Sequence, residues 1–529
     1  MLTLDSTIGE LYRTPIGRDL ADKLLMQAGL PQSTLTNPLV SHMKIRSASK
    51  LVPGKIEPAL FDAILNLVNR EPEIVSAAKG PVKPAWWKEA VFYQIYPRSF
   101  CDSNGDGIGD IPGIISRLDY LKDLGVDALW LSPVYDSPND DNGYDIRDYR
   151  AIMAEFGTME DFDRLLAEVH ARGMRLIMDL VINHTSDEHA WFREALADPS
   201  SPRRNYYFLQ PGRPDAPPNN WASFFSGSAW RYFPEEGLWG LHLFSKKQMD
   251  LNWEDDGLRR EVLDMIRWWL EKGVDGFRCD AAGEVPAKFW KAILPKMNAD
   301  YPEIYLLAEA ERENLADPCE TFDANYAWEL HHLLNSLAQG RKTVADLKDY
   351  VARDAEKFPK EAFRLSFTSN HDENSWSGTE FEREGIYANA CAVLCFTLPG
   401  TQPLIYTGQE IGLNRRLAFF EKDPITDWTP NEYTAFWKGL VDLKHQNAAL
   451  AAGERGGEIS WWEVPEGIVA FSRTKGENQV IVIANFGKED YTPVFNIPDT
   501  VYTNHFTGEK VEGPANLSIA PGEYVVLTK

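Results

Sequence analysis

Acidic and histidine side chains stand at the ends of four short apolar runs, where their types suit nucleophilic and acid–base chemistry. The four stretches are 179–184 (DLVINH), 276–280 (GFRCD), 308–309 (AE) and 369–372 (SNHD). On a strand, Arg278 and Asp280 would face the same side, and the guanidinium would favour the ionised carboxylate. Glu309 would stay protonated near neutral pH, because it would lie partly buried beside that negative charge. An anion and a proton donor in one site form the pair that cleaves glycosidic bonds.

Alternating strand and helix patterns must position these residues. Strands are predicted at 91–96, 128–132, 176–182, 274–280, 304–308, 322–326, 364–368 and 403–406, and helices at 114–124, 161–172, 258–272 and 387–398. Eight strand–helix units in about 350 residues suggest a (β/α)8 TIM barrel, an α/β fold whose βα loops converge at the C-terminal strand ends. The acids and histidines would then share one rim. Carboxyl groups about 5–5.5 Å apart on adjacent strands would act with retention of configuration.

Composition shifts along the chain predict further domains. Helical spacing of apolar residues over 1–82, for example Ile16, Leu20 and Leu24, indicates an N-terminal helical extension. The barrel would occupy 83–184 and 254–450, interrupted by an irregular insertion at 185–253 that is rich in Pro, Gly and aromatic residues. Strand-like runs over 451–529 predict a C-terminal antiparallel β-sandwich domain. Packing or homo-oligomerisation is the expected role of the helical extension.

Charge and cysteine content exclude several function classes. The 529 residues carry a formal net charge of −25, which would repel a phosphate backbone or an anionic membrane surface, so neither nucleic acid nor membrane is an expected partner. Five cysteines without paired spacing favour a reducing compartment over a disulfide framework. The first residues lack a basic and apolar leader, so a cytoplasmic location is expected.

From about residue 90 to the C-terminus the sequence resembles the α-amylase superfamily of retaining α-glycoside hydrolases, closest to its α-glucosidase and oligo-1,6-glucosidase branch. The four stretches above carry the resemblance, and 248–253 (QMDLNW) resembles the marker segment that ends the insertion in that branch. The resemblance implies that Asp280 is the nucleophile, Glu309 the general acid/base, and Asp372 the third acid that holds the sugar hydroxyls.

The same resemblance implies the substrate-binding residues. His184, Arg278 and His371 would line the subsite of the reacting sugar, and Tyr144 would form the aromatic platform under its ring. Asp141 matches a position that holds the non-reducing end in related α-glucosidases, which implies exo action. The segment 415–424 departs from the family pattern, so the arginine that normally partners Asp141 is not assigned.

One loop suits a metal ion. Asp102, Asn104, Asp106 and Asp110 place oxygen donors at alternate positions around glycines, as a calcium loop does; an Asx-turn loop without metal is the alternative. The resemblance implies a structural Ca²⁺ or Mg²⁺ there, with the carbonyl of Ile108 among its ligands. A second calcium site is not expected, since 282–284 (AGE) replaces the Lys-His pair of conventional α-amylases. No organic cofactor is required.

These features predict a retaining, exo-acting α-glucosidase that hydrolyses short malto-oligosaccharides. Ala281 resembles the α-1,4-preferring members, so the linkage preference leans toward α-1,4. The alternatives are a transglycosylase or isomerase of the same family that forms trehalose or sucrose isomers, or an α-amylase. A more remote alternative is a non-catalytic carbohydrate-binding member.

Overall fold

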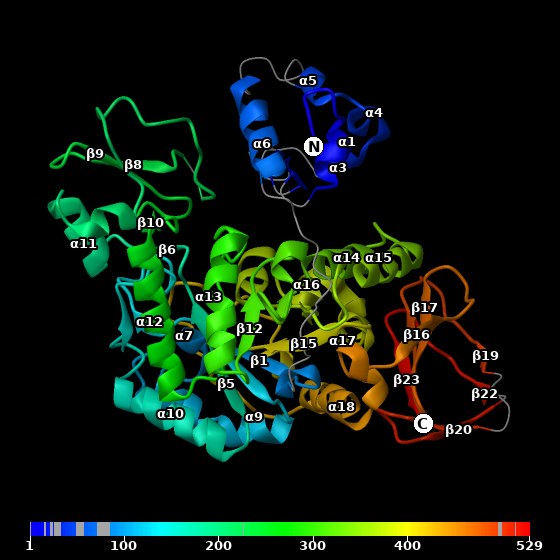
Figure 1. Cartoon of the computed structure of the whole chain (residues 1–529). Helices are drawn as coiled ribbons and strands as arrows, with labels where there is room; N and C mark the ends of the chain where they lie inside the picture. The colour runs from blue at the N-terminus through cyan, green and yellow to red at the C-terminus, as the bar shows by residue number, and fades with distance from the viewer. Residues whose placement is uncertain are drawn as a thin grey trace. The chain divides into compact units, whose positions relative to one another are not determined.

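The computed structural model describes residues 2–14, 17–18, 20–21, 25, 33–48, 58–70, 85–225, 227–495, 500–513 and 515–529. Main-chain contacts divide the chain into two compact units (Figure 1). One comprises Met1–Lys79 with Arg312–Asn314, and the other Gly80–Glu311 with Leu315–Lys529. The domain boundaries expected at 82, 184, 253 and 450 stay predictions.

Eight parallel strands close a barrel at the centre of the larger unit, which confirms the predicted fold class. In chain order they are β1 (Phe92–Ile95), β2 (Ala128–Leu131), β5 (Arg175–Leu180), β11 (Gly276–Cys279), β12 (Tyr305–Ala308), β13 (Ala324–Tyr326), β14 (Phe363–Ser366) and β15 (Thr401–Tyr406). Each strand pairs with its neighbours in sequence, and β15 pairs back to β1.

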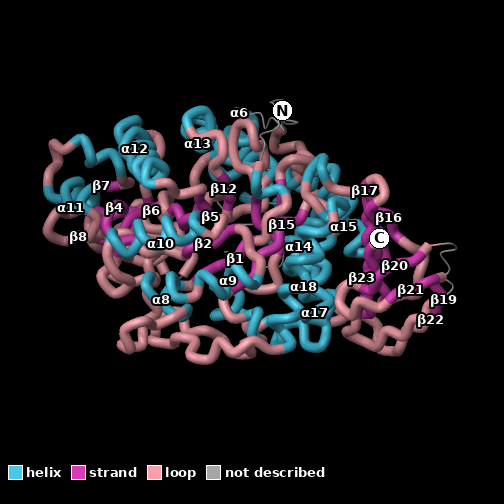
Figure 2. Tube along the Cα trace, turned by 90° about the horizontal axis from the view of Figure 1, so that it is seen from below, coloured by secondary structure: helices cyan, strands magenta, loops and turns pink. Residues whose placement is uncertain are grey.

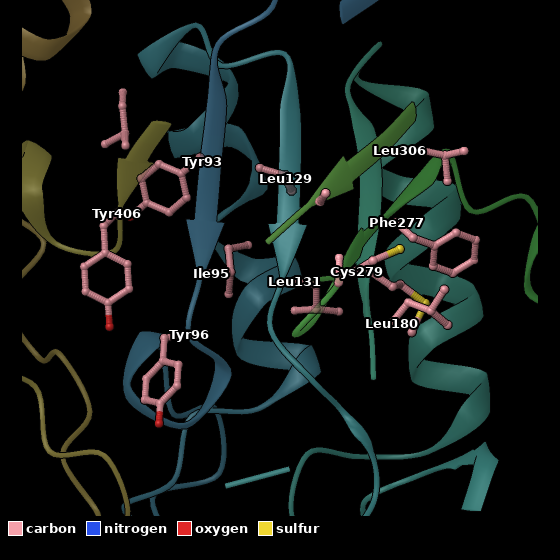
Figure 3. Packing of buried hydrophobic residues seen from close by; sticks show 14 of the residues in the cluster. Tyr93, Ile95, Tyr96, Leu129, Leu131, Leu180, Phe277, Cys279, Leu306 and Tyr406 are labelled. Atoms are coloured by element: carbon pink, nitrogen blue, oxygen red, sulfur yellow. The ribbon is translucent and has the colours of Figure 1, made fainter. Parts of the chain in front are cut away.

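Side chains alternate between the two faces of the barrel strands. Phe277 and Cys279 belong to the large apolar cluster between strands and helices, together with Leu129, Leu180 and other residues in Figure 3. Arg278 lies between them in sequence and therefore faces the barrel interior. Because that interior also holds aromatic rings from several strands, Arg278 is completely buried.

Helices cover the outside of the barrel (Figure 2). They are α8 (Ile111–Ser116), α9 (Leu118–Leu124), α10 (Met159–Ala171), α12 (Asp256–Lys272), α13 (Ala287–Asp300), α14 (Trp328–Ala338), α15 (Val344–Lys357), α16 (Glu380–Glu384), α17 (Ala388–Thr397) and α18 (Glu432–Gln446). Gly125 and Gly273 end α9 and α12 in the left-handed conformation, with φ of 94° and 106°. Among the described residues, no helix is long and apolar enough to cross a bilayer.

Two helix predictions need correction. The single helix expected at 114–124 is split at Arg117, whose φ of −106° and ψ of 2° are not helical, into α8 and α9. The connection from β12 to β13 holds only the 3-10 turn η3 (Glu313–Leu315), so one of the eight units lacks its helix. Asp317-Pro318 interrupts that short polar connection, which leaves too few residues for a helix to form.

The insertion after β5 is more regular than its composition predicts. It contains β6 (His184–Ser186), α11 (Ala190–Ala197), the 3-10 turn η2 (Pro202–Tyr206), β7 (Leu209–Pro211), β8 (Trp230–Phe233), β9 (Leu238–Leu241) and β10 (Gln248–Asp250). Strands β7, β9 and β8 form a small antiparallel sheet. The antiparallel pairing of β6 with β10 sets Asp250 opposite His184, so the start and end of the insertion lie side by side at the barrel rim.

The C-terminal part forms an antiparallel sheet in the order β16-β17-β18-β23-β20-β21, as predicted. Its strands are β16 (Glu458–Trp461), β17 (Ile468–Lys475), β18 (Asn478–Asn485), β20 (Val501–Asn504), β21 (Lys510–Glu512) and β23 (Tyr524–Thr528), and β19 (Val494–Phe495) pairs with β22 (Ala515–Asn516). Alternate residues of β17 face opposite ways. Val469 and Phe471 join the main core, whereas Ile468 and Ala470 pack in a separate cluster.

The smaller unit contains α1 (Ile8–Tyr12), α3 (Ser33–Thr36), α4 (Pro38–Ser41), α5 (Ile45–Ala48) and α6 (Pro58–Arg70). Its core gathers Leu11, Ile45, Phe61, Ile64 and Leu65. The predicted helical character is confirmed for these segments, whereas Ile16, Leu24 and the boundary at 80–84 lie outside the described residues.

Candidate active site

Arg278 organises the carboxyl groups at the barrel rim. In the parallel register it lies opposite Asp179 of β5, and its Nη1 is 2.8 Å from Asp179 Oδ1 and 2.8 Å from Asp280 Oδ1. Its Nη2 lies 2.8 Å from Glu309 Oε1, an ion-pair contact without hydrogen-bond alignment. Its Nε donates to Tyr326 Oη at 3.0 Å. One guanidinium therefore contacts three carboxyl groups from three successive strands.

Main-chain hydrogen bonds hold Asp280 and Glu309 one residue beyond their strands. The Asp280 amide donates to Leu180 O and the Glu309 amide to Cys279 O, both at 3.0 Å. The amide of Ala281 then donates to Glu309 Oε2 at 2.7 Å. This last contact is made possible by a left-handed backbone at Ala281, with φ of 43°. The two carboxyl groups are thus positioned by the backbone as well as by Arg278.

The two carboxyl groups titrate on opposite sides of neutrality. Burial raises the pKa of Asp280 to about 6 despite the opposing charge of Arg278. Burial and the nearby Asp280 charge raise the pKa of Glu309 to about 8, with Arg278 again opposing. At pH 7, Asp280 is therefore mainly an anion and Glu309 mainly a proton donor. Arg278 limits the rise for Asp280 and does not reverse it, because desolvation is the larger effect.

A chain of hydrogen bonds fixes Tyr144 above this cluster. Gln94 Nε2 lies 2.9 Å from His371 Nδ1, and His371 Nε2 lies 2.9 Å from Tyr144 Oη, which donates to Asp179 Oδ2 at 3.2 Å. Burial lowers the pKa of His371 well below its usual range. A neutral imidazole that accepts at Nδ1 and donates at Nε2 satisfies every partner, and we assign that tautomer. The rings of Tyr144 and His371 lie 5.5 Å apart and nearly parallel.

Asp372 is the most open of the three predicted catalytic acids. Its side chain is 39% exposed, against 20% for Glu309 and 13% for Asp280. Burial of the carboxyl within this cluster raises the pKa of Asp372 to about 6. Of the three acids, Asp280 is therefore the most shielded from solvent.

Gln248 holds Asp141, a partner that sequence reasoning missed. Its Nε2 donates to Asp141 Oδ2 at 2.7 Å, whereas Arg415 pairs with Asp423. Burial raises the pKa of Asp141 well above its usual range. His184 Nε2 donates to Tyr144 O at 2.9 Å, and burial lowers the pKa of His184 to about 4, so its ring is neutral. The insertion thereby contributes directly to the site.

The structure brings the predicted acids and their neighbours into one cluster, and it adds three residues. Asp179, Tyr326 and Gln248 contact predicted site residues but were not assigned to the site from sequence. Gln248 was visible only as part of the marker segment. Asp179 was visible as the first residue of the 179–184 stretch, but its contact with Arg278 follows only from strand register. Tyr326 could be found only from the folded barrel, because it lies far from Arg278 in sequence.

Aromatic rings extend from the site to the surface. The ring centre of Phe419 lies 6.3 Å from that of His371 and 5.4 Å from that of Trp376. Trp376 is 62% exposed. On the insertion, the ring centre of Phe244 lies 5.2 Å from that of His184 and 6.0 Å from that of the exposed Phe225. Flat exposed rings beside a carboxylate site suit contacts with sugar rings.

The predicted metal loop has the right donor chemistry but not a preformed cage. Oxygen atoms of Asp102, Asn104 and Asp106 accept main-chain hydrogen bonds within the loop, and Asp110 accepts from Ser103 and Gly113. These are the Asx turns of the alternative interpretation. Among the described residues, no three acidic, histidine or cysteine side chains converge as metal ligands.

Comparisons with known proteins agree with this geometry. Residues 94–432 match the family model of the α-amylase catalytic domain. An oligo-1,6-glucosidase of Parageobacillus thermoglucosidasius is 37% identical over 79% of this chain and 92% of its own, and one of Heyndrickxia coagulans is 43% identical over 64% and 69%. The crystal structure of the isomaltulose synthase from Klebsiella sp. LX3 superposes with a TM-score of 0.73 at 30% identity, over 84% of this chain and 99% of that one. A family match across the barrel, a relative aligned over most of the chain and a shared fold establish that this chain is a glycoside hydrolase of the α-amylase family.

Proposed function

We propose that the protein is a retaining α-glucosidase that removes single glucose units from the non-reducing ends of short oligosaccharides. The observation that carries this proposal is the contact of Asp280 and Glu309 with one guanidinium, combined with their opposite protonation at pH 7. Carboxyl groups on neighbouring nitrogens of one planar cation are close together, which favours a covalent route over one with water between them.

The chemistry follows from that pair. An Asp280 oxygen attacks the anomeric carbon while the glycosidic C–O bond breaks, and the Glu309 proton passes to the leaving oxygen. Glu309, now an anion, then takes a proton from water whose oxygen attacks the same carbon and releases Asp280. Two inversions return glucose of α configuration. Arg278 favours the ionised form of Asp280 before the attack and again when water releases it from the glycosyl ester, and Asp372 is placed to hold sugar hydroxyls.

Exo action rests on Asp141 and Gln248. Asp141 lies on the loop that carries Tyr144, and Gln248 joins it to the insertion through the 2.7 Å hydrogen bond. A sugar ring stacked on Tyr144 would meet this pair at its far end, which leaves room for one terminal glucose. The pair takes the place of the carboxylate–arginine contact of related α-glucosidases.

The preference for α-1,4 bonds that the sequence predicts rests on Ala281 alone. The relatives are named for α-1,6 bonds: two oligo-1,6-glucosidases and a glucan 1,6-alpha-glucosidase of Streptococcus pneumoniae. Since they align over most of the chain and Ala281 is a single position, we place isomaltose ahead of maltose as substrate.

Sugar transfer is the second candidate function. The solved structures of isomaltulose synthase and of the trehalulose synthase of Pseudomonas mesoacidophila MX-45 share this fold at 30% and 29% identity. In that reaction a sugar hydroxyl replaces water in the second step. The exposed rings of Trp376 and Phe225 offer surfaces on which an acceptor sugar could stack.

One experiment separates these functions. The protein is incubated with isomaltose, maltose and sucrose in turn, and the products are followed by NMR from the first minute. Release of α-glucose, fastest from isomaltose, supports the proposal. Initial β-glucose would refute retention, and conversion of sucrose to its isomers without free glucose would establish transfer instead.

We also propose that the 102–110 loop binds Ca²⁺ or Mg²⁺ as a structural ion. All its donors are oxygens, the ligands that these cations prefer, and the residues that would hold it are Asp102, Asn104, Asp106, Asp110 and the carbonyl of Ile108. The ion would stiffen the first βα loop. Added Ca²⁺ should raise the unfolding temperature of the native protein and not of an Asp102→Asn variant; equal shifts would exclude this loop.

A further inference from the structure

A cavity of about 470 Å³ lies within the larger unit, away from the active site. Its walls come from α15, from the segments that precede β14 and β15, and from β16 and β17 of the C-terminal sheet. The cavity therefore lies at the N-terminal ends of these barrel strands, whereas the catalytic residues follow the C-terminal ends. The volume is that of a site for one small organic molecule.

Arg473 presents unused hydrogen-bonding capacity to this cavity. Its side chain is 2% exposed, its Nε donates to Gly457 O at 3.0 Å and its Nη1 donates to Thr397 O at 2.7 Å. Its Nη2 has no hydrogen-bond or ion-pair partner among the described residues, although the residue lines the cavity wall. A buried guanidinium whose protein partners are only neutral carbonyls is an incomplete ion site, because buried charges are normally paired.

Glycine residues keep the guanidinium open to the cavity. A Cβ added to Gly456 would lie 2.1 Å from Ala451 O and 3.2 Å from Arg473 Nη2. A Cβ on the adjacent Gly457 would lie 2.5 Å from Thr474 O. The main chain thus approaches too closely for side chains at these two positions, and none covers Nη2 from this wall.

Two of the three acidic residues that line the cavity are paired with other cations. Asp354 pairs with Arg364 at 2.8 Å, and the exposed Glu458 pairs with Lys360 at 3.3 Å. Asp349 also lines the cavity, but it is exposed, so solvent screens its charge. Desolvation lowers the pKa of Arg473 to about 10, so the guanidinium is still charged at pH 7. The charge of Glu458 opposes that lowering, but among the described residues no carboxylate forms an ion pair with Arg473. The cavity therefore holds a cation without a contacting carboxylate, in a protein whose net charge is −25.

Lys348 of α15 and Trp461 of β16, the strand that pairs with the strand of Arg473, supply the complementary features. Lys348 Nζ lies 5.6 Å from the centre of the Trp461 ring, and no carboxylate forms an ion pair with it in the described part of the chain. Trp461 is partly exposed and is braced edge-on by Phe471 at 5.2 Å. A fixed indole face beside two cations suits a molecule with a ring and an anionic group.

We propose that this cavity is a second ligand site that binds a hexose monophosphate. The phosphoryl oxygens accept hydrogen bonds from Arg473 Nη2 and Lys348 Nζ, and the apolar face of the sugar ring packs on Trp461. Arginine and lysine are the side chains that bind phosphoryl groups best. A neutral sugar would leave the guanidinium unpaired, and inorganic phosphate would leave the indole face and most of the cavity unfilled.

Calorimetry on the intact protein tests this site with glucose 6-phosphate, glucose and inorganic phosphate as probes. Glucose 6-phosphate should bind about tenfold or more tightly than either other probe. Lys348→Met and Trp461→Ala should each weaken it about tenfold, with kcat/KM for isomaltose unchanged. Lys357→Met is the matched control, since Lys357 also lies on α15 over an aromatic ring, that of Phe358 at 4.9 Å, but does not line the cavity.

The test uses Lys348→Met, Trp461→Ala and Lys357→Met. It does not depend on Arg473→Met, because that change removes a buried hydrogen-bonded group and can unfold the domain. Binding of inorganic phosphate as tight as that of glucose 6-phosphate would overturn the proposal. It would also be overturned by a glucose 6-phosphate affinity that Lys348→Met leaves unchanged, or by the absence of measurable heat at millimolar ligand.

Discussion

Two of the buried arginines, Arg278 and Arg473, lie in opposite electrostatic surroundings. Arg278 contacts Asp179, Asp280 and Glu309 at 2.8 Å, and Coulombic attraction from them outweighs desolvation, so its pKa rises well above the usual value. Arg473 donates only to carbonyls, and desolvation lowers its pKa to about 10.

The contrast separates a complete charge network from an incomplete one. Around Arg278 three carboxyl groups share one cation, so the guanidinium has its counter-charge inside the protein and one carboxyl group can be ionised while another stays protonated. Around Arg473 no carboxylate of the described residues is in contact, since Glu458 acts on it only through its charge, and a ligand can supply that contact. Burial alone therefore does not reveal what a charged residue does; its partners do.

Replacing Asp280 with asparagine removes the nucleophile but keeps an oxygen that can accept from Arg278. Turnover of isomaltose should fall by at least about a thousandfold, because the covalent step is lost. The circular dichroism spectrum should not change. A variant with the parent rate would remove Asp280 from the mechanism.

Replacing either buried arginine with methionine tests the comparison directly. Arg278→Met leaves three buried carboxyl groups without their cation and should lower the free energy of unfolding by about 3–5 kcal/mol at pH 7. Arg473→Met leaves only carbonyls unpaired and should lower it by about 1–3 kcal/mol. Urea unfolding monitored by tryptophan fluorescence measures both. Equal losses would mean that partner charges do not distinguish the two sites.

The pH dependence tests whether the carboxyl groups around Arg278 titrate as described. The value of kcat/KM should rise as Asp280 ionises near pH 6 and fall as Glu309 loses its proton near pH 8. Because folding raises the pKa of Glu309, its contribution to stability is full below pH 4.5 and is lost as pH rises through 8.

Between pH 5 and 8 the free energy of unfolding should therefore fall less steeply with pH in Glu309→Gln than in the parent protein. The two slopes should differ by at most about 1.4 kcal/mol per pH unit. The kcat/KM profile of Glu309→Gln should also lack the alkaline fall. A steeper loss of stability than in the parent would mean that Glu309 is ionised in the folded state.

The smallest expected effect concerns the link between Asp141 and the insertion. Gln248→Ala removes one hydrogen bond to a buried carboxyl group, which is worth about 1 kcal/mol, or about a fivefold rise in KM for isomaltose. Gln210→Ala, on β7 of the same insertion, is the control. An unchanged KM in Gln248→Ala would leave Asp141 without a role in holding the terminal sugar.

Much of the fold and of the catalytic cluster could be predicted from local pattern. Apolar runs at regular spacing predicted all eight barrel strands, since parallel strands covered by helices are apolar throughout. The positions of Asp280, Glu309 and Asp372 directly after such runs placed them at one rim. The split helix at Arg117 was not predictable, because tertiary packing overrides weak local preference there. The missing helix before β13 could have been expected from Asp317-Pro318, since proline disfavours a helix through that connection.

The sequence by itself determined the barrel, the order of its strands and the acids that follow them, because these depend on periodicity and on residue type. Tertiary structure alone decided which groups meet. Asp179 reaches Arg278 only through strand register, Gln248 reaches Asp141 only because the insertion returns to its own start, and Arg473 lacks a carboxylate only because of how the C-terminal sheet packs. Protonation and pairing depend on distances in space, which separation along the chain does not encode.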